Sequence, residues 1–132
     1  MEPVIAESYR AALDHCAYRF LEAAGPFRVA GEDRDAFLQR QSTNDINTLQ
    51  PGGTLLTVLT NPAARILDVL RLLLPENDEQ QSLLAMTLPG RFTSTFTHLK
   101  SRIFFMDKVT LEDRSDSYVC LMPVSYTHLT LP

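Results

Sequence analysis

The alternation of apolar and polar residues is clearest between residues 54 and 74, where two apolar segments flank a short turn. Residues 54–60 are rich in β-branched side chains, which is typical of a strand. Asn61-Pro62-Ala63-Ala64 is typical of a turn, and residues 65–74 form a second, longer apolar run. The pattern therefore predicts an antiparallel hairpin.

One carboxylate, Asp68, lies inside the second strand of this hairpin. With a period of two, it shares one face with Ile66, Leu70, Leu72 and Leu74. The other face carries Leu67, Val69 and Leu73 together with Arg65 and Arg71. Both faces are largely apolar, so we expect cover on both sides of the strand. A buried carboxylate requires a partner, so Asp68 either ties down nearby backbone or serves a ligand.

Three segments have the three-to-four-residue apolar spacing of helices. The first covers residues 4–24 and ends before Gly25-Pro26, a pair that stops a helix. The second runs from Asp33, a suitable N-cap, to Gln41. The third follows Pro89-Gly90, and its apolar face consists of Phe92, Phe96, Leu99 and Ile103.

Further strands are expected at residues 27–30, 82–88, 107–113 and 117–121, and residues 42–53 are expected to form a polar loop. Strands outnumber helices, and hairpins occur among them. This order predicts an α+β fold with a mixed, largely antiparallel sheet and flanking helices.

Composition narrows the class of protein. The chain has 132 residues and a formal net charge of -4, which argues against a nucleic-acid or anionic-membrane surface. No apolar run has the length of a membrane span. Cys16 and Cys120 are far apart and lack CxxC spacing, so we expect ordinary core or helix cysteines, no metal site and a cytoplasmic location.

The last nine residues, 124–132, are similar to the translation of a transposon-end adapter from shotgun sequencing libraries. We therefore expect residues 1–123 to be the native part, and residues 124–132 to be read-through that carries no function. His128 is excluded as a candidate catalyst on this ground. The alternative is that these residues form a natural strand.

Residue chemistry alone identifies few candidates, because phosphate-loop, HExxH and GxSxG motifs are all missing from the sequence. His15 and His98 each lie on a helix with charged residues and are expected at the surface. Asn44 and Asp45 follow a helix, where a C-cap and a local backbone hydrogen bond would explain both.

Three blocks of the chain resemble the YgfZ/GcvT folate-binding superfamily, in the same order and with the same spacing. They are VAGEDRDAFLQRQSTNDINTLQPG (residues 29–52), LTNPAARILDVL (59–70) and RIFFMDKV (102–109). The resemblance implies the N-terminal part of a folate-binding domain, with tetrahydrofolate as the cofactor. It covers most of residues 27–113.

The superfamily has two well-known branches, and two departures distinguish them here. The aminomethyltransferase branch has adjacent aspartates in the strand after the turn, and the second, catalytic one aligns with Val69, whereas Asp68 matches the first. A valine cannot stabilise developing positive charge, so transferase activity is not expected. Arg65 replaces a glycine and resembles the YgfZ branch, which supports iron–sulfur cluster assembly or repair. The cysteine motif of that branch would lie beyond this sequence.

The resemblance thus implies a truncated tetrahydrofolate-binding protein that supports iron–sulfur cluster assembly or repair. Its partners would be the folate and, with it, iron–sulfur assembly machinery or client proteins. The alternatives are a folate-dependent aminomethyltransferase and a fragment without function. By this resemblance the folate-binding residues are Asn44, Asp45, Arg65, Asp68, Thr87 and Arg91, with Arg65, Arg71 or Arg91 meeting the glutamate tail through their guanidinium groups.

Overall fold

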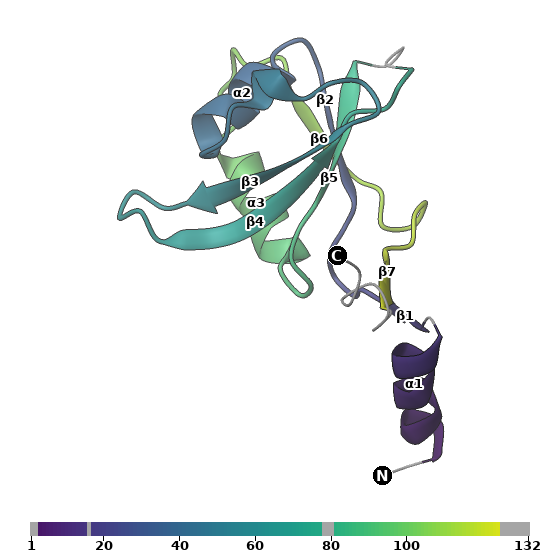
Figure 1. The fold of residues 1–132 in the computed structure, drawn as a ribbon. Helices are drawn as coiled ribbons and strands as arrows, with labels where there is room; N and C mark the ends of the chain where they lie inside the picture. The colour runs from purple at the N-terminus through teal and green to yellow at the C-terminus, as the bar shows by residue number, and fades with distance from the viewer. Residues whose placement is uncertain (1–2, 16, 78–80, 125–132) are drawn as a thin grey trace. The chain divides into compact units, whose positions relative to one another are not determined.

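The computed structural model describes residues 3–15, 17–77 and 81–124, which divide into two compact units. One unit combines residues 1–21 with residues 119–132, and the other consists of residues 22–118. The elements, labelled in Figure 1, are α1 (Pro3–Asp14), β1 (Ala17–Phe20), β2 (Phe27–Ala30), α2 (Arg34–Gln41), a 3-10 turn (Ile46–Thr48), β3 (Thr54–Thr60), β4 (Ile66–Leu73), β5 (Ser82–Met86), α3 (Phe92–Ser101), β6 (Thr110–Asp113) and β7 (Leu121–Val124).

The smaller unit contains α1 and an antiparallel pair formed by β1 and β7. The prediction of one helix over residues 4–24 is wrong in its second half, because α1 ends at Asp14 and residues 17–20 pair with residues 121–124. The strand predicted at residues 117–121 is displaced for the same reason. Tyr18 and Phe20 favour a strand where a partner strand is present. Cys16 and the expected adapter residues 125–132 lie outside the described residues.

The larger unit is built on a five-stranded sheet with the order β3-β4-β5-β2-β6 (Figure 1). All four strand pairings are antiparallel, so the predicted α+β class is confirmed and the expected mixed sheet is, in the described strands, antiparallel. The predicted hairpin is also confirmed, with residues 54–60 paired to residues 66–73. Strand β6 begins at Thr110, three residues later than expected.

Helices α2 and α3 cover one face of this sheet, and the hydrophobic core lies between them. Phe37 and Leu38 of α2 and Leu99 of α3 are fully buried against Phe27 and Leu70 of the sheet. Phe27 also contacts the rings of Phe92 and Phe96, with centroid distances of 6.1 and 5.8 Å. The expected apolar face of α3 is therefore confirmed as core packing.

The expectation that β4 is covered on both sides is wrong for the described residues. Asp68, Leu70 and Leu72 are buried, whereas Leu67 and Val69 are half-buried and Arg71 and Leu73 are exposed. This alternation is typical of an antiparallel sheet with one covered face. We call the other face, formed by the outward residues of β3, β4 and β5, the open face.

Two local features hold the loops of the larger unit in place. Gly31 has φ +115, and a Cβ added there would lie 2.0 Å from the carbonyl oxygen of Lys108. Asp33 precedes α2 as predicted, but its carboxylate accepts from the backbone N–H of Lys108 at 2.9 Å and makes no cap hydrogen bond to the helix. Both contacts join the start of α2 to the segment before β6.

Candidate functional site

The Asp68 carboxylate is 1% exposed and is bonded by donors from three segments. Its Oδ1 accepts from the backbone N–H of Val69 at 2.8 Å and from that of Leu88 at 3.1 Å. Its Oδ2 accepts from the hydroxyl of Thr95, which is itself buried. Three donors satisfy a buried carboxylate well. Asp68 therefore joins β4 to the segment after β5 and to α3.

Val69, at the aligned catalytic position of the aminomethyltransferase branch, points away from Asp68 onto the open face. It pairs with Val58 of β3, and the next outward residue of β4, Arg71, lies between Leu56 and Met86. Val69, Val58 and Met86 are half-buried, and Leu56 is 51% exposed. The open face is thus a mostly apolar surface that carries the guanidinium of Arg71.

Thr87 and Arg91 lie close to Asp68 through the chain segment that links β5 to α3. Thr87 is buried and donates its hydroxyl to the carbonyl of Leu88 at 2.9 Å, so this oxygen already has a partner. The same Leu88 donates its N–H to Asp68. Arg91 is the N-cap residue of α3 and is exposed. Thr87 and Arg91 therefore lie on the same connecting segment as Leu88, the residue that donates to Asp68.

Asn44, Asp45 and Arg65 lie elsewhere in the larger unit. The Asn44 amide donates to the carbonyl of Leu56 at 2.7 Å, which attaches the loop to β3. Asp45 caps the 3-10 turn by accepting from Asn47 N–H at 3.1 Å. Arg65 is exposed at the end of the hairpin turn. The C-cap of α2 is Ser42, so Asn44 does not have that expected role.

A cavity of about 220 Å³ lies beside the Thr95 end of this network. It is lined by Leu59, Leu67, Arg91, Ser94, Thr95 and His98. Sequence reasoning missed Ser94, Thr95 and the lining role of His98, which is half-buried. The available signal was their spacing, because residues 91, 95, 98 and 102 recur along one face of a helix.

A second cavity of about 220 Å³ adjoins the first at His98. Its lining comes from the end of α2, the hairpin turn and the end of α3, and consists of Arg40, Gln41, Ser42, Thr43, Thr60, Asn61, Pro62, His98 and Arg102. Arg40 is held there by an ion pair with Asp107 at 2.9 Å and by stacking near Phe37 and Phe104. His98 is therefore the residue that both cavities share.

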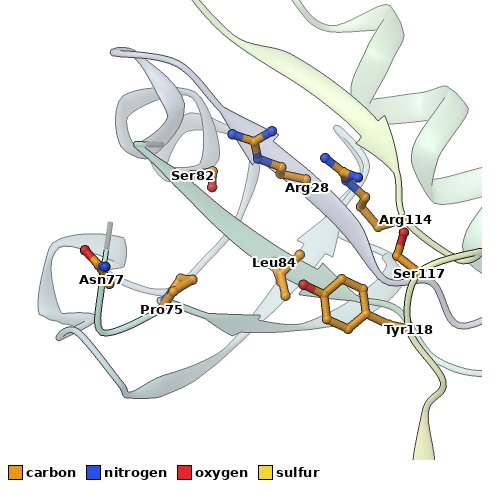
Figure 2. A pocket seen from close by; sticks show the side chains of 8 residues that line it. All are labelled: Arg28, Pro75, Asn77, Ser82, Leu84, Arg114, Ser117 and Tyr118. Carbon is orange, nitrogen blue, oxygen red and sulfur yellow. The ribbon is translucent and has the colours of Figure 1, made fainter. Parts of the chain in front are cut away.

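A third cavity, of about 360 Å³, includes the outward-facing Leu84 of β5 in its lining and is drawn in Figure 2. Leu84 and the ring of Tyr118 are drawn near the centre of the view, and Pro75 and Asn77 are drawn to their left (Figure 2). Arg28 and Arg114 lie along another side, and both contact Oε2 of Glu112, at 3.5 and 3.3 Å. This shared carboxylate offsets part of their positive charge.

Among the described residues, three side chains have shifted pKa values. A hydrogen bond from the backbone N–H of Phe104 is the main cause that lowers the pKa of Asp107. Burial opposes this shift, and the hydrogen bond and charge of the Arg40 guanidinium lower the pKa further. Hydrogen bonds from Ser115 lower the pKa of Asp113. Burial raises the pKa of the Cys120 thiol, which makes this cysteine less reactive.

None of the helices in the described part of the chain is long and apolar enough to cross a bilayer. The described residues also contain no group of three or more histidine, cysteine, aspartate or glutamate side chains arranged to hold a metal ion.

Comparison with known proteins gives one sequence relative and a shared fold. No family model matches the chain. An Arabidopsis thaliana protein of the chloroplast, provisionally named a transferase, is 34% identical over 89 residues, which are 67% of this chain and 20% of that protein. The crystal structure of glycine cleavage system aminomethyltransferase T from Bartonella henselae matches 100% of this chain and 37% of its own, with a TM-score of 0.76 and 20% identity.

These matches establish the fold as that of a part of an aminomethyltransferase T-like protein. The chain spans a fifth of the length of the Arabidopsis relative and about a third of the Bartonella enzyme. The expected α+β fold is thereby confirmed, whereas membership of the superfamily and of its YgfZ branch stays a prediction. The cytoplasmic location also stays a prediction, since the plant relative is a chloroplast protein.

Proposed function

We propose that this chain is part of a folate-dependent protein of the aminomethyltransferase type, and that its open face forms one wall of the tetrahydrofolate site. The observation that carries the proposal is the aminomethyltransferase T fold, which extends over the whole chain with a TM-score of 0.76. The transferase name of the plant relative supports the same class of activity.

The open face suits the two ends of a folate. A pteridine ring is flat and largely apolar on its faces, so it would pack on Val58, Val69 and Met86, which are half-buried. The glutamate tail ends in carboxylates, for which the exposed guanidinium of Arg71 is a suitable partner. Asp68 would support this wall from the core side through its bonds to Leu88 and Thr95.

Folate-dependent one-carbon transfer is the activity that the comparisons favour, because both matched proteins are named as transferases. A second candidate is tetrahydrofolate binding in support of iron–sulfur cluster assembly or repair. Two residues favour it, because Val69 lacks an acid–base group and Arg65 matches the pattern of that branch. In that case the partners would be assembly proteins or iron–sulfur clients.

The binding proposal is tested by anaerobic calorimetry with tetrahydrofolate on the full-length natural protein. Val69→Trp should abolish saturable binding, since an indole would occupy the ring position. Ile66→Trp is the matched control, because Ile66 is 68% exposed at the start of the same strand. Binding that survives in Val69→Trp, binding that is lost in both variants, or no saturable binding to the wild type would each refute the proposed site.

A second assay distinguishes one-carbon transfer from the iron–sulfur role. One-carbon transfer to tetrahydrofolate is measured for the wild type and for Val69→Asp, which restores an acid at the aligned position. Turnover by the wild type identifies a transferase. Folate binding without turnover, together with reduced iron–sulfur enzyme activity in cells that lack the protein, identifies the second candidate.

A further inference from the structure

The two smaller cavities lie along α3 and share His98 in their linings, and we call them together the His98 groove. It consists of the lining of the two 220 Å³ cavities that meet at His98. Arg91 lies in one cavity, and Arg40 and Arg102 lie in the other. The described lining residues of both cavities include no aspartate or glutamate. In a chain with a net charge of -4, this is a local excess of positive charge.

The charges of the groove are only partly explained by the stability of the fold. His98 is in the last turn of α3 and Arg102 is its C-cap residue, where positive charge complements the helix dipole. Arg40 forms an ion pair with Asp107. Arg91, however, is at the N-terminus of the same helix, where a cation is unfavourable, and the first turn has no acid to compensate. Among the described residues, neither Arg91 nor Arg102 forms an ion pair with a carboxylate.

The spacing of these cations sets the shape of a ligand. Arg91 and Arg102 are eleven positions apart, which is about 16 Å along a helix, and His98 lies between them. Hydroxyl groups accompany the cations at both ends, from Ser94 in one cavity and from Thr43 in the other. Guanidinium and hydroxyl groups together are a suitable donor set for carboxylate or phosphate oxygens.

We propose that the His98 groove binds an elongated small molecule with an anionic group at each end, one at Arg91 and one at Arg102. The imidazole of His98 would contact the middle of the ligand. This proposal does not depend on folate binding, because the open face and the His98 groove are formed by different residues and can be tested separately.

The experiment follows the His98 imidazole signal by ¹H–¹³C NMR during titration of the 132-residue protein. The probes are dodecanedioate, a dicarboxylate of twelve carbons; a linear polyphosphate of six units; and orthophosphate, a single anionic group. The first two are long enough when extended to approach both ends of the groove. We expect saturable shifts of His98 with dodecanedioate or the polyphosphate, and an affinity for orthophosphate that is at least about tenfold weaker. Binding of dodecanedioate alone would indicate a carboxylate ligand, and binding of the polyphosphate alone would indicate a phosphate ligand.

Variants locate the two ends of the ligand. Arg91→Ala and Arg102→Ala should each lower the affinity for the bound probe about tenfold, as expected for loss of one charge-assisted contact. Arg19→Ala, an exposed arginine of β1 in the other unit, is the matched control and should change it less than about twofold. Arg91→Glu, which keeps a long side chain, should abolish binding. A His98 signal that does not shift with any probe, or a loss of affinity in only one of the two alanine variants, would overturn the proposal.

Discussion

Replacing Asp68 by alanine removes the acceptor of three hydrogen bonds from a position that is 1% exposed. The backbone N–H groups of Val69 and Leu88 and the hydroxyl of Thr95 then lose their partner. Hydrogen bonds to a charged group contribute about 1.5–3 kcal/mol each, and unsatisfied buried donors add a desolvation penalty. These contributions are not additive, so we expect a loss of about 3–5 kcal/mol.

Two milder variants test whether the hydrogen bonds are the cause. The amide oxygen of Asp68→Asn can accept from both N–H groups, and its NH₂ can donate to the Thr95 hydroxyl, so the loss should be about 1–2 kcal/mol. Thr95→Val removes one donor while keeping the shape of the side chain, at a similar cost of about 1–2 kcal/mol. Asp68→Asn combined with Thr95→Val should show a coupling energy of about 0.5–3 kcal/mol.

The assay is urea unfolding followed by circular dichroism, with thermal melting as a second measurement. For a domain of this size, a loss of about 3 kcal/mol lowers Tm by roughly 12–24 °C. Tyr18→Ala, an exposed side chain of the other unit, serves as the background control. A loss below about 1 kcal/mol for Asp68→Ala would refute the reasoning, because Asp68 would then not hold the three segments together.

Three further predictions follow from local geometry. Gly31→Ala should destabilise the protein by more than about 2 kcal/mol in urea unfolding, because the new Cβ would lie 2.0 Å from the carbonyl oxygen of Lys108. Gly90→Ala is the control: Gly90 also has a positive φ, but a Cβ there would meet open space, so the cost should be only about 1–2 kcal/mol. The pKa of Asp107 is lower in the folded state than in the unfolded state. The ionised Asp107 therefore stabilises the fold at a pH above its unfolded-state pKa, and this stabilisation is lost as the pH falls through its folded-state pKa. When the free energy of unfolding is measured from pH 7 to pH 2, it should decline less for Asp107→Asn than for the wild type. Burial raises the pKa of the Cys120 thiol and so lowers its reactivity. In a Cys16→Ser background, iodoacetamide should therefore label Cys120 much more slowly in buffer than in urea, as followed by mass spectrometry. Equal labelling rates in the two solutions would contradict the prediction.

Much of the larger unit could be predicted because its elements are encoded by nearby residues. The β-branched segment at residues 54–60 and the alternating segment at residues 66–73 each specify a strand, and a short turn makes them neighbours. The spacing of Phe92, Phe96 and Leu99 likewise specifies the buried face of α3. In each case the signal lies within about twenty residues of sequence.

The errors concern pairing between distant segments. Residues 17–20 have both helical spacing and strand-forming side chains, and their pairing with residues 121–124 decides in favour of the strand. The polar loop at residues 42–53 contains a 3-10 turn with Ile46 buried in the core. No local pattern contains the partner strand or the core that selects these conformations.

The candidate site shows the same division. The sequence by itself determined that Asp68 and Val69 point to opposite faces of a strand, because side chains alternate with a period of two. Only the tertiary structure decided that the Asp68 face is the core and that the Val69 face is open, since burial depends on what packs against each face. It also decided that Arg40 of α2 lies near Arg91 and Arg102, the two ends of α3, because two separate helices must fold together before these charges come close.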